Sequence, residues 1–381
     1  MVYIEYKPEI RLYMSLKAGI VGLPNVGKST LFNAITNSHV EAANYPFATI
    51  NPNTGVVNVP DERLTFLTNL FQPKRSIPAT FEFYDIAGLV RGASKGEGLG
   101  NQFLGHIREC DAIVEVVRCF DSSEIIHVEE SVDPKRDIET INLELAMADL
   151  ATVQKRLAAV ETKARISKDK ELVHEVDVLK KFLPLLENGE PARKVSLSED
   201  DRVFAAKQYQ LLTLKPIIYV ANVSDSDYAD IESCKYYHVV KEIAENEHAQ
   251  VIPISCEIEY ELSSLPKEER MEFLQTLGAS ESGLDKVTKA VYKLLNLSTF
   301  FTCGADECRA WTFKNGMLAP QCAGIIHSDF EKGFIKAEIY SFEDLVTYKS
   351  ELALKEAGKL RMEGKTYVMQ DGDCVFFRFN V

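Results

Sequence analysis

Residues 22–29 read GLPNVGKS and fit the pattern G-x-x-x-x-G-K-[ST]. A short apolar run, residues 18–21, precedes the pattern, and Leu31, Phe32 and Ile35 follow it at helical spacing. This order of strand, glycine-rich loop and helix is the context in which the pattern cradles phosphate. Backbone N–H groups and the helix N-terminus then face phosphate oxygens. The chain is therefore predicted to bind a nucleoside triphosphate in an α/β fold.

The order of apolar segments predicts an α/β domain that is interrupted by a helical hairpin. Strands are expected at residues 18–21, 55–59, 80–84 and 112–117, and again at 216–221 and 251–254. Between these two groups, apolar residues recur at spacings of three and four over 150–164 and 172–186, with a charged turn at 167–170. Two such seams joined by a short turn indicate an antiparallel pair of helices. Further helices are expected at 198–212, 267–277 and 284–295.

The last part of the chain has a different character. From about residue 299, short apolar runs alternate with glycine turns, which predicts strands at 309–313, 333–339, 365–369 and 373–380, with a capped helix starting at Ser341. The predicted division is an N-terminal extension (1–16), a first part of the nucleotide domain (17–125), the helical insertion (126–200), a second part of the nucleotide domain (201–298) and a C-terminal domain (299–381).

Composition excludes several other classes of protein. The 381 residues are 46% hydrophobic and carry a net charge of −14, which argues against wholesale electrostatic binding to nucleic acid. No apolar run approaches the ~18 residues of a membrane span, so no membrane partner is expected. The eight cysteines form no CxxC pair and no zinc-like spacing. Such scattered thiols suit a reducing compartment, and a cytoplasmic location is predicted.

Three further segments are expected to complete the phosphate and metal site. The sequence D-x-x-G at 85–88 ends a predicted strand, where Asp85 would lie on the Mg²⁺ side and the Gly88 N–H would face the γ-phosphate. Thr49 is the candidate to close over Mg²⁺, with Thr54 as its competitor. The glycine-rich stretch 92–105 is interpreted as a segment that orders around the γ-phosphate, or else as an ordinary surface loop.

The loop after the strand at 216–221 is the candidate base reader. The guanine-reading motif is N-K-x-D, and this chain has Asn222 and Asp225 but Val223 at the lysine position. Guanine selectivity is therefore not secured by the motif. Leu89 stands where Ras-type enzymes place a glutamine that orients water, so hydrolysis needs another group or is slow.

Several long stretches resemble the YchF/Obg-like ATPases. They are residues 22–29, 44–53 (NYPFATINPN) and 84–102 (YDIAGLVRGASKGEGLGNQ), with RAWT at 309–312, HSDFEKGFI at 327–335 and DGD at 371–373. The resemblance covers residues 17–381. It implies a translation-factor-related P-loop domain with a coiled-coil hairpin insertion and a C-terminal TGS domain of β-grasp type. It also implies slow Mg²⁺-dependent hydrolysis of ATP and association with the ribosome or its large subunit.

The chain departs from this family's pattern at two positions. The family usually has N-x-x-E at the base-reading loop, whereas Asp225 is the residue that guanine readers use. The family commonly has a histidine where this chain has Glu115. Glu115 is interpreted either as a general base that orients water or as a structural residue, and His106 is the alternative catalytic group. Asn25 suggests K⁺ as a second cation beside the phosphates.

The predicted site residues fall into three groups. Catalytic roles are assigned to Lys28, Glu115 and His106; nucleotide contacts to Asn25, Val26, Gly27, Lys28, Ser29, Thr30, Gly88, Asn222, Val223, Asp225, Ser255 and Cys256; and metal ligation to Ser29, Thr49 and Asp85. Basic residues near the hairpin turn are either a solvated surface or a contact for ribosomal RNA phosphates; they are Lys155, Arg156, Lys163, Arg165, Lys168 and Lys170. Alternatives to an ATPase are a GTPase of the same fold and a non-catalytic, nucleotide-gated ribosome-binding protein.

Overall fold

A parallel sheet holds the phosphate-binding motif in the computed structural model, which describes residues 16–37, 53–86, 99–123, 125, 127 and 131–380. Its strand order is β2-β4-β1-β5-β6-β7, and only the β2–β4 pair is antiparallel. The strands are β1 (Lys17–Val21), β2 (Thr54–Asn58), β4 (Thr80–Asp85), β5 (Ala112–Arg118), β6 (Ile217–Asn222) and β7 (Gln250–Ile254). Every residue of β5 and β6 is buried. This is expected for central strands of a parallel sheet that is covered on both faces.

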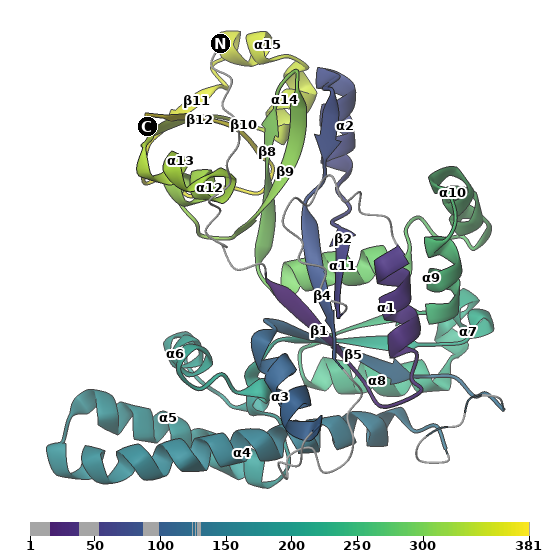
Figure 1. The fold of residues 1–381 in the computed structure, drawn as a ribbon, viewed down its shortest axis with the longest axis vertical. Helices are drawn as coiled ribbons and strands as arrows, with labels where there is room; N and C mark the ends of the chain where they lie inside the picture. The colour runs from purple at the N-terminus through teal and green to yellow at the C-terminus, as the bar shows by residue number, and fades with distance from the viewer. Residues whose placement is uncertain are drawn as a thin grey trace.

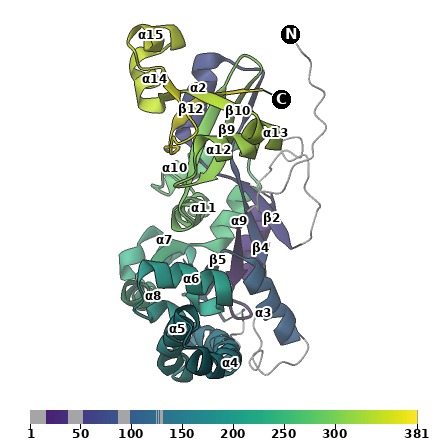
Figure 2. The same cartoon turned by 90° about the vertical axis from the view of Figure 1, so that its left-hand side faces the viewer.

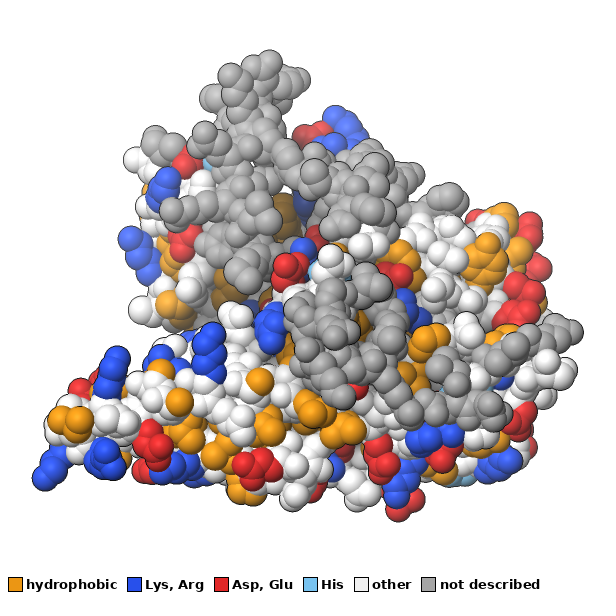
Figure 3. Space-filling model, turned by 60° about the horizontal axis from the view of Figure 1, so that its bottom comes forward, with side chains coloured by type: hydrophobic (Ala, Val, Ile, Leu, Met, Phe, Trp, Pro, Cys, Tyr) orange, Lys and Arg blue, Asp and Glu red, His pale blue; other side chains and the backbone are white. Residues whose placement is uncertain are grey.

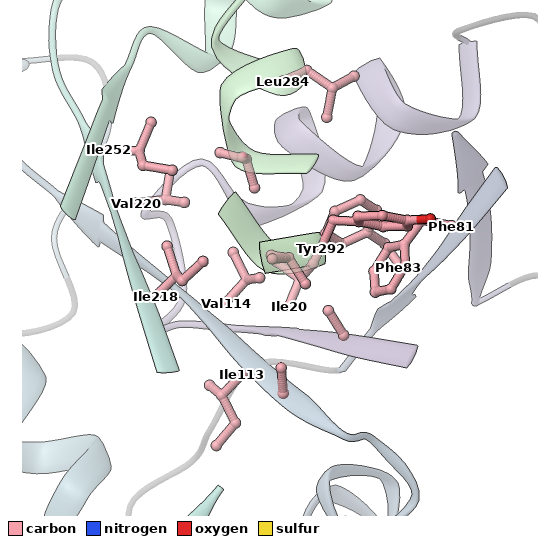
Figure 4. Packing of buried hydrophobic residues seen from close by; sticks show 14 of the residues in the cluster. Ile20, Phe81, Phe83, Ile113, Val114, Ile218, Val220, Ile252, Leu284 and Tyr292 are labelled. Atoms are coloured by element: carbon pink, nitrogen blue, oxygen red, sulfur yellow. The ribbon is translucent and has the colours of Figure 1, made fainter. Parts of the chain in front are cut away.

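Helices cover both faces of this sheet (Figure 1). The helices around it are α1 (Lys28–Asn37), α3 (Leu99–Glu109), α7 (Asp225–Ala229), α8 (Lys235–Asn246), α9 (Cys256–Ser263), α10 (Lys267–Thr276) and α11 (Gly283–Leu294). Figure 4 shows Ile20, Val114 and Val220 pointing toward α11, which contributes Leu284 and Tyr292, whereas Ile113 points to the opposite face. The two faces of β5 therefore belong to different packing layers.

The predicted helical hairpin is confirmed, and it projects sideways from the nucleotide domain (Figure 1). It consists of α4 (Pro134–Ser167) and α5 (Lys170–Glu187). Asp133 caps α4, with Pro134 at its first position, and Asp169 caps α5. The turn requires a left-handed residue, which is Lys168 at φ 54°. The facing sides of the two helices bury the second apolar core of the molecule, which includes Val153, Val160, Val176, Leu179 and Phe182.

The base of the hairpin rests on short elements that follow it in sequence. These are η3 (Ala192–Lys194), α6 (Glu199–Tyr209) and η4 (Leu212–Leu214). The carboxylate of Asp149 on α4 accepts hydrogen bonds from the Leu212 N–H at 2.8 Å and from the Thr213 N–H and hydroxyl at 2.8 and 2.6 Å. The helix predicted for 198–212 ends at Tyr209, because Gln210 adopts a left-handed conformation.

A second six-stranded sheet, with the order β11-β10-β12-β8-β9-β3, lies in the C-terminal domain, and one of its six strands, β3, precedes that domain in the sequence (Figure 2). Its strands are β3 (Arg75–Ile77), β8 (Leu297–Cys303), β9 (Glu307–Lys314), β10 (Phe334–Ser341), β11 (Arg361–Glu363) and β12 (Asp373–Phe379). Helices α12 (Ala319–Ile326) and α13 (Ser328–Lys332) enclose its apolar core, and α14 (Phe342–Tyr348) and α15 (Glu351–Glu356) follow β10. Ser341 caps α14, as predicted.

The structure corrects the prediction in this sheet. Residues 365–369 form no strand: Val368 makes only an isolated bridge to Leu318. The Met369 N–H donates to the Met317 carbonyl at 3.0 Å, but the partner segment enters α12 at Ala319, so the pairing does not extend into a ladder. The sequence prediction also missed β8, helix α2 (Glu62–Phe71) and β3, which is only three residues long. In the part of the chain that the structure describes, no helix is both long enough and apolar enough to span a membrane.

Candidate nucleotide-binding site

Two glycines of the motif at 22–29 occupy positions that no larger residue fits. A Cβ on Gly27 would lie 2.2 Å from the Asn222 side-chain nitrogen, and Gly27 has φ +99°. A Cβ on Gly22 would lie 2.8 Å from the Val116 carbonyl oxygen. Asn25 adopts a left-handed conformation at φ 64°, which asparagine tolerates better than most residues. The loop therefore has the tight curvature of a phosphate cradle.

Lys28 begins α1 and is nearly buried, with 9% of its surface exposed. Its ammonium group donates to the Asp85 carboxylate at 2.5 Å. Asp85 ends β4, and β4 pairs directly with β1. The structure thus brings together the lysine and the carboxylate that the sequence assigned to phosphate and metal. Ser29 is exposed at the start of α1 beside this pair.

The predicted base-reading residues come from three segments and meet beside the phosphate loop. Asn222, at the end of β6, donates to the Val26 carbonyl at 2.9 Å and accepts from the Cys256 N–H at 3.0 Å. The Ser255 hydroxyl donates to the Asp225 carboxylate at 2.6 Å, and it also caps α9 by accepting from the Ile258 N–H. These bonds join the loop after β6, the loop after β7 and the phosphate loop into one unit.

The side chain of Val223 points into the protein interior, unlike those of Asn222 and Asp225, which bond to neighbouring loops. Its side chain is 2% exposed within the apolar core, and its N–H donates to the Ile254 carbonyl at 2.9 Å. A lysine at this position of the guanine-reading motif would pack its stem over the base. Val223 therefore supports the loop from inside the apolar core, and its predicted nucleotide contact stays a prediction.

Glu115 lies on β5 and is 1% exposed. It is two residues from Ile113, so it shares the face of the sheet opposite to Val114 and α11. In the described part of the chain, its two carboxyl oxygens are the only buried side-chain oxygen or nitrogen atoms without a hydrogen-bond partner. Desolvation by burial raises the pKa of Glu115 to about 8; the charge of Arg193 acts in the opposite direction.

The surroundings of Glu115 belong to the base of the hairpin. Arg193, on η3, forms a buried ion pair with Glu247 at 2.7 Å and donates to the Asn142 side chain on α4 at 2.9 Å. The Tyr219 hydroxyl donates to Glu247 at 2.8 Å, and Tyr219 is the neighbour of Glu115 in the β5–β6 register. Sequence analysis missed this cluster because its members are far apart in the chain and match no local pattern.

His106, the alternative catalytic residue, lies on α3. Its ring stacks edge-on against Tyr84, with ring centres 5.3 Å apart. The catalytic roles of Glu115 and His106 stay predictions. Thr49, Gly88 and Leu89 lie outside the described residues.

The donor set suits a magnesium ion that is shared with phosphate. Ser29 offers a hydroxyl and Asp85 a carboxylate, which are hard oxygen ligands of the kind that Mg²⁺ prefers. Over the described residues there is no group of three or more His, Cys, Asp or Glu side chains that could hold a metal by themselves. Mg²⁺ usually takes only one or two protein ligands and completes its shell with phosphates and water.

The fold and this site define a P-loop nucleoside triphosphatase of the GTPase class. Residues 17–163 match the family model described as "50S ribosome-binding GTPase", and residues 297–380 match the C-terminal model YchF-GTPase_C, described as a protein of unknown function. The Bacillus subtilis protein named "Ribosome-binding ATPase YchF" is 56% identical over 97% of this chain and 100% of its own length. The protein of the same name from Escherichia coli O157:H7 is 54% identical over the same shares of the two chains. The chain belongs to the YchF family.

Solved structures agree with this assignment. The solved structure of the Schizosaccharomyces pombe YchF GTPase has a TM-score of 0.86 at 43% identity, and the match covers 96% of this chain and 98% of that one. A GTP-binding protein from Pyrococcus horikoshii has a TM-score of 0.57 at 18% identity, covering 96% and 100% of the two chains. The second likeness supports the fold alone.

Proposed function

We propose that this protein is a Mg²⁺-dependent ATPase that binds ribosomes and hydrolyses ATP to ADP and phosphate, slowly when alone. The observation that carries the proposal is the match over 97% of this chain to proteins named ribosome-binding ATPases. The Lys28–Asp85 pair beside the glycine loop supplies the chemistry that such an activity needs. We further propose a cytoplasmic location and the five-part division of the chain, with β3 as an addition to the C-terminal sheet.

Catalysis by these residues consists mainly of positioning and charge stabilisation. Loop N–H groups and Lys28 would bind phosphate oxygens, and Ser29 and Asp85 would hold a metal ion, which would neutralise developing charge. Lys28 donates to Asp85 in the structure, so phosphate binding redirects part of the lysine's donor capacity from Asp85 to the nucleotide. We propose that Thr49 and the Gly88 N–H complete the site, with Glu115 or His106 acting on water.

A second candidate function is that of a GTPase, which the Ser255–Asp225 hydrogen bond favours. Ser255 holds one carboxylate oxygen of Asp225, which leaves the other oxygen as an acceptor. Guanine offers N–H donors on its ring N1 and its amino group, whereas adenine presents a lone pair at N1. A fixed carboxylate therefore favours guanine, and the missing lysine stem at Val223 weakens that preference. Calorimetric affinities for ATP and GTP decide between the two, and Asp225→Glu should move the ratio toward ATP.

The hairpin is proposed to contact ribosomal RNA. Figure 3 shows Lys and Arg side chains along the hairpin and at its tip, interspersed with acidic ones. Arg156 is also exposed, but its guanidinium pairs with Glu175 at 2.6 Å. The remaining exposed basic residues are Lys155, Lys163, Arg165, Lys168 and Lys170. Contacts to RNA phosphates would make ribosome affinity fall steeply with salt concentration.

The test of the proposed function is ATP turnover with and without ribosomes. We expect slow release of phosphate by the protein alone and a changed rate with ribosomes. No turnover in either condition would leave the non-catalytic, nucleotide-gated binding protein as the better description. Equal turnover in K⁺ and Na⁺ buffers would remove K⁺ as a cofactor beside Asn25.

A further inference from the structure

Residues 61–77 connect two strands of the nucleotide sheet but pack on the C-terminal domain. They form α2 and β3, between β2 and β4. β3 joins the other sheet as a parallel neighbour of β9, with Arg75 opposite Glu307 and Ile77 opposite Arg309. The Arg75 N–H donates to the Asp306 carbonyl at 3.2 Å. The nucleotide domain thus contributes a strand to the sheet of its neighbour (Figure 1).

Arg63 on α2 clamps this junction. Its guanidinium donates to Asp371 in the C-terminal domain at 2.7 Å and to Asp61 at 2.8 Å. Asp371 in turn accepts from the Thr299 N–H at 2.9 Å, so the clamp reaches the backbone of β8. Burial by itself lowers the pKa of Arg63, but the hydrogen bonds to Asp61 and Asp371 raise it above its ordinary value. Such a two-carboxylate site favours arginine over lysine because the planar guanidinium donates in several directions.

Apolar contacts surround the clamp and close the junction. The rings of Phe66 on α2 and Phe342 on α14 pack edge-on with centres 5.4 Å apart. Arg63 also lies 5.2 Å from the centre of the Phe301 ring. Gly372 has φ +83°, and a Cβ there would lie 3.1 Å from the Arg63 guanidinium. A glycine next to Asp371 therefore allows the arginine to approach.

A short path connects this junction to the phosphate site. Only Pro78 and Ala79 separate β3 from β4, and the Ala79 carbonyl accepts from the Val59 N–H at 2.8 Å. β4 then runs six residues to Asp85, whose carboxylate holds Lys28. The strand that positions Asp85 is thus held by the C-terminal sheet at one end and by the P-loop lysine at the other.

We propose that α2 and β3 couple the docking of the C-terminal domain to the nucleotide state of the P-loop. The inference rests on the proposed nucleotide binding. Docking of the C-terminal domain fixes the position of the first residues of β4. It therefore holds Asp85, at the other end of β4, within reach of Lys28 and of a bound metal ion. In the opposite direction, nucleotide binding at Lys28 and Asp85 stabilises β4 and, through β4, the pairing of β3 with β9. Such coupling is reciprocal: whatever holds the C-terminal domain, a ribosome included, changes nucleotide affinity by the same factor as nucleotide changes docking.

The test compares Arg63→Ala with wild type in the full-length protein. Calorimetry measures the Kd for Mg²⁺ with a non-hydrolysable ATP analogue, and hydrogen exchange of peptides that span β3 and β9 measures docking. We expect Arg63→Ala to speed exchange at β3 and to raise the Kd about tenfold, within the usual range of coupling between sites. Nucleotide should slow exchange at β3 in wild type and have less effect in the variant. Arg378→Ala is the matched control, because Arg378 forms an exposed ion pair with Glu338 in the same sheet.

The exchange rates and the Kd together test the coupling. A junction that opens in Arg63→Ala while the Kd stays within about twofold of wild type would overturn the coupling. If Arg63→Ala leaves exchange unchanged, the double variant Arg63→Ala/Phe342→Ala removes both kinds of contact. A junction that stays closed even then would refute the docking role given to the α2 contacts, and with it the coupling. A wild-type protein that binds no nucleotide would refute the proposed function itself, which distinguishes the two failures.

Discussion

Replacing Glu115 with glutamine should make the nucleotide domain more stable at alkaline pH. The carboxyl group is buried on β5 without a hydrogen-bond partner, and its pKa is about 8 in the folded protein, against an ordinary value of 4.5. The folded state therefore holds the proton more tightly than the unfolded state does. The stabilisation is fully present below about pH 4.5 and is lost as the pH rises through about 8.

The size of the effect follows from this difference in pKa. Each unit corresponds to about 1.36 kcal/mol, so the 3.5 units between 4.5 and 8 amount to about 5 kcal/mol as an upper bound. Between about pH 6 and about pH 9 the loss is about 3 kcal/mol, and the remainder falls mostly at lower pH. Charged groups that face Glu115 are Arg193 on η3, Glu247 after α8 and Asp137 on α4, with the Tyr219 hydroxyl on β6.

The measurement is hydrogen exchange of peptides that span β5 and β6. Tryptophan fluorescence would report the other domain, because Trp311 lies on β9. We expect the stability of Glu115→Gln relative to wild type to increase steadily over this pH range. Glu139→Gln, on the exposed side of α4, is the control and should show no such trend. A constant difference between Glu115→Gln and wild type would refute the reasoning, because Glu115 would then titrate alike in both states.

Three further predictions follow from single contacts. Lys28→Ala should reduce ATP turnover about 10²–10³-fold, measured by phosphate release, because it removes a preorganised charge; turnover within about tenfold of wild type would contradict this role. Gly27→Ala should weaken nucleotide affinity by calorimetry, since its Cβ would overlap the Asn222 side chain and displace the loop; unchanged affinity would show that the loop yields. Asp149→Ala should destabilise the base of the hairpin by several kcal/mol, because each buried N–H left without an acceptor costs about 1–3 kcal/mol. Urea unfolding measures the loss, and Asp177→Ala, at an exposed position, should have little effect.

The phosphate site and the hairpin could be predicted because their signals are local. The glycine loop places its glycines where the backbone must curve, and the seams over 150–164 and 172–186 repeat at the spacing of packed helices. The pairing of Asn222 with the P-loop was foreseeable only from a motif, since the contact joins residues 196 positions apart.

The remaining features depend on contacts that no local pattern encodes. β3 is too short for an alternating pattern, and it is a strand only because β9 is beside it. The segment 365–369 has the apolar content of a strand, but its partner segment enters α12 at Ala319 and leaves only one bridge, between Leu318 and Val368. The environment of Glu115 is set by Arg193 and Glu247, which come from two different segments after the hairpin. For such residues the tertiary structure decides the role, and the sequence supplies only the residue type.

The pairing of β3 with the C-terminal sheet has a consequence for synthesis of the chain. Lys74 and Asp306, which pair beside β3, are 232 positions apart. At about 5–20 residues per second, the segment around β3 is synthesised roughly 10–50 s before its partner strand. During that interval the segment has no sheet to join, and a C-terminal domain produced alone would expose the edge of β9. A fragment that begins near β8 should therefore tend to self-associate, and a peptide containing β3 should suppress this.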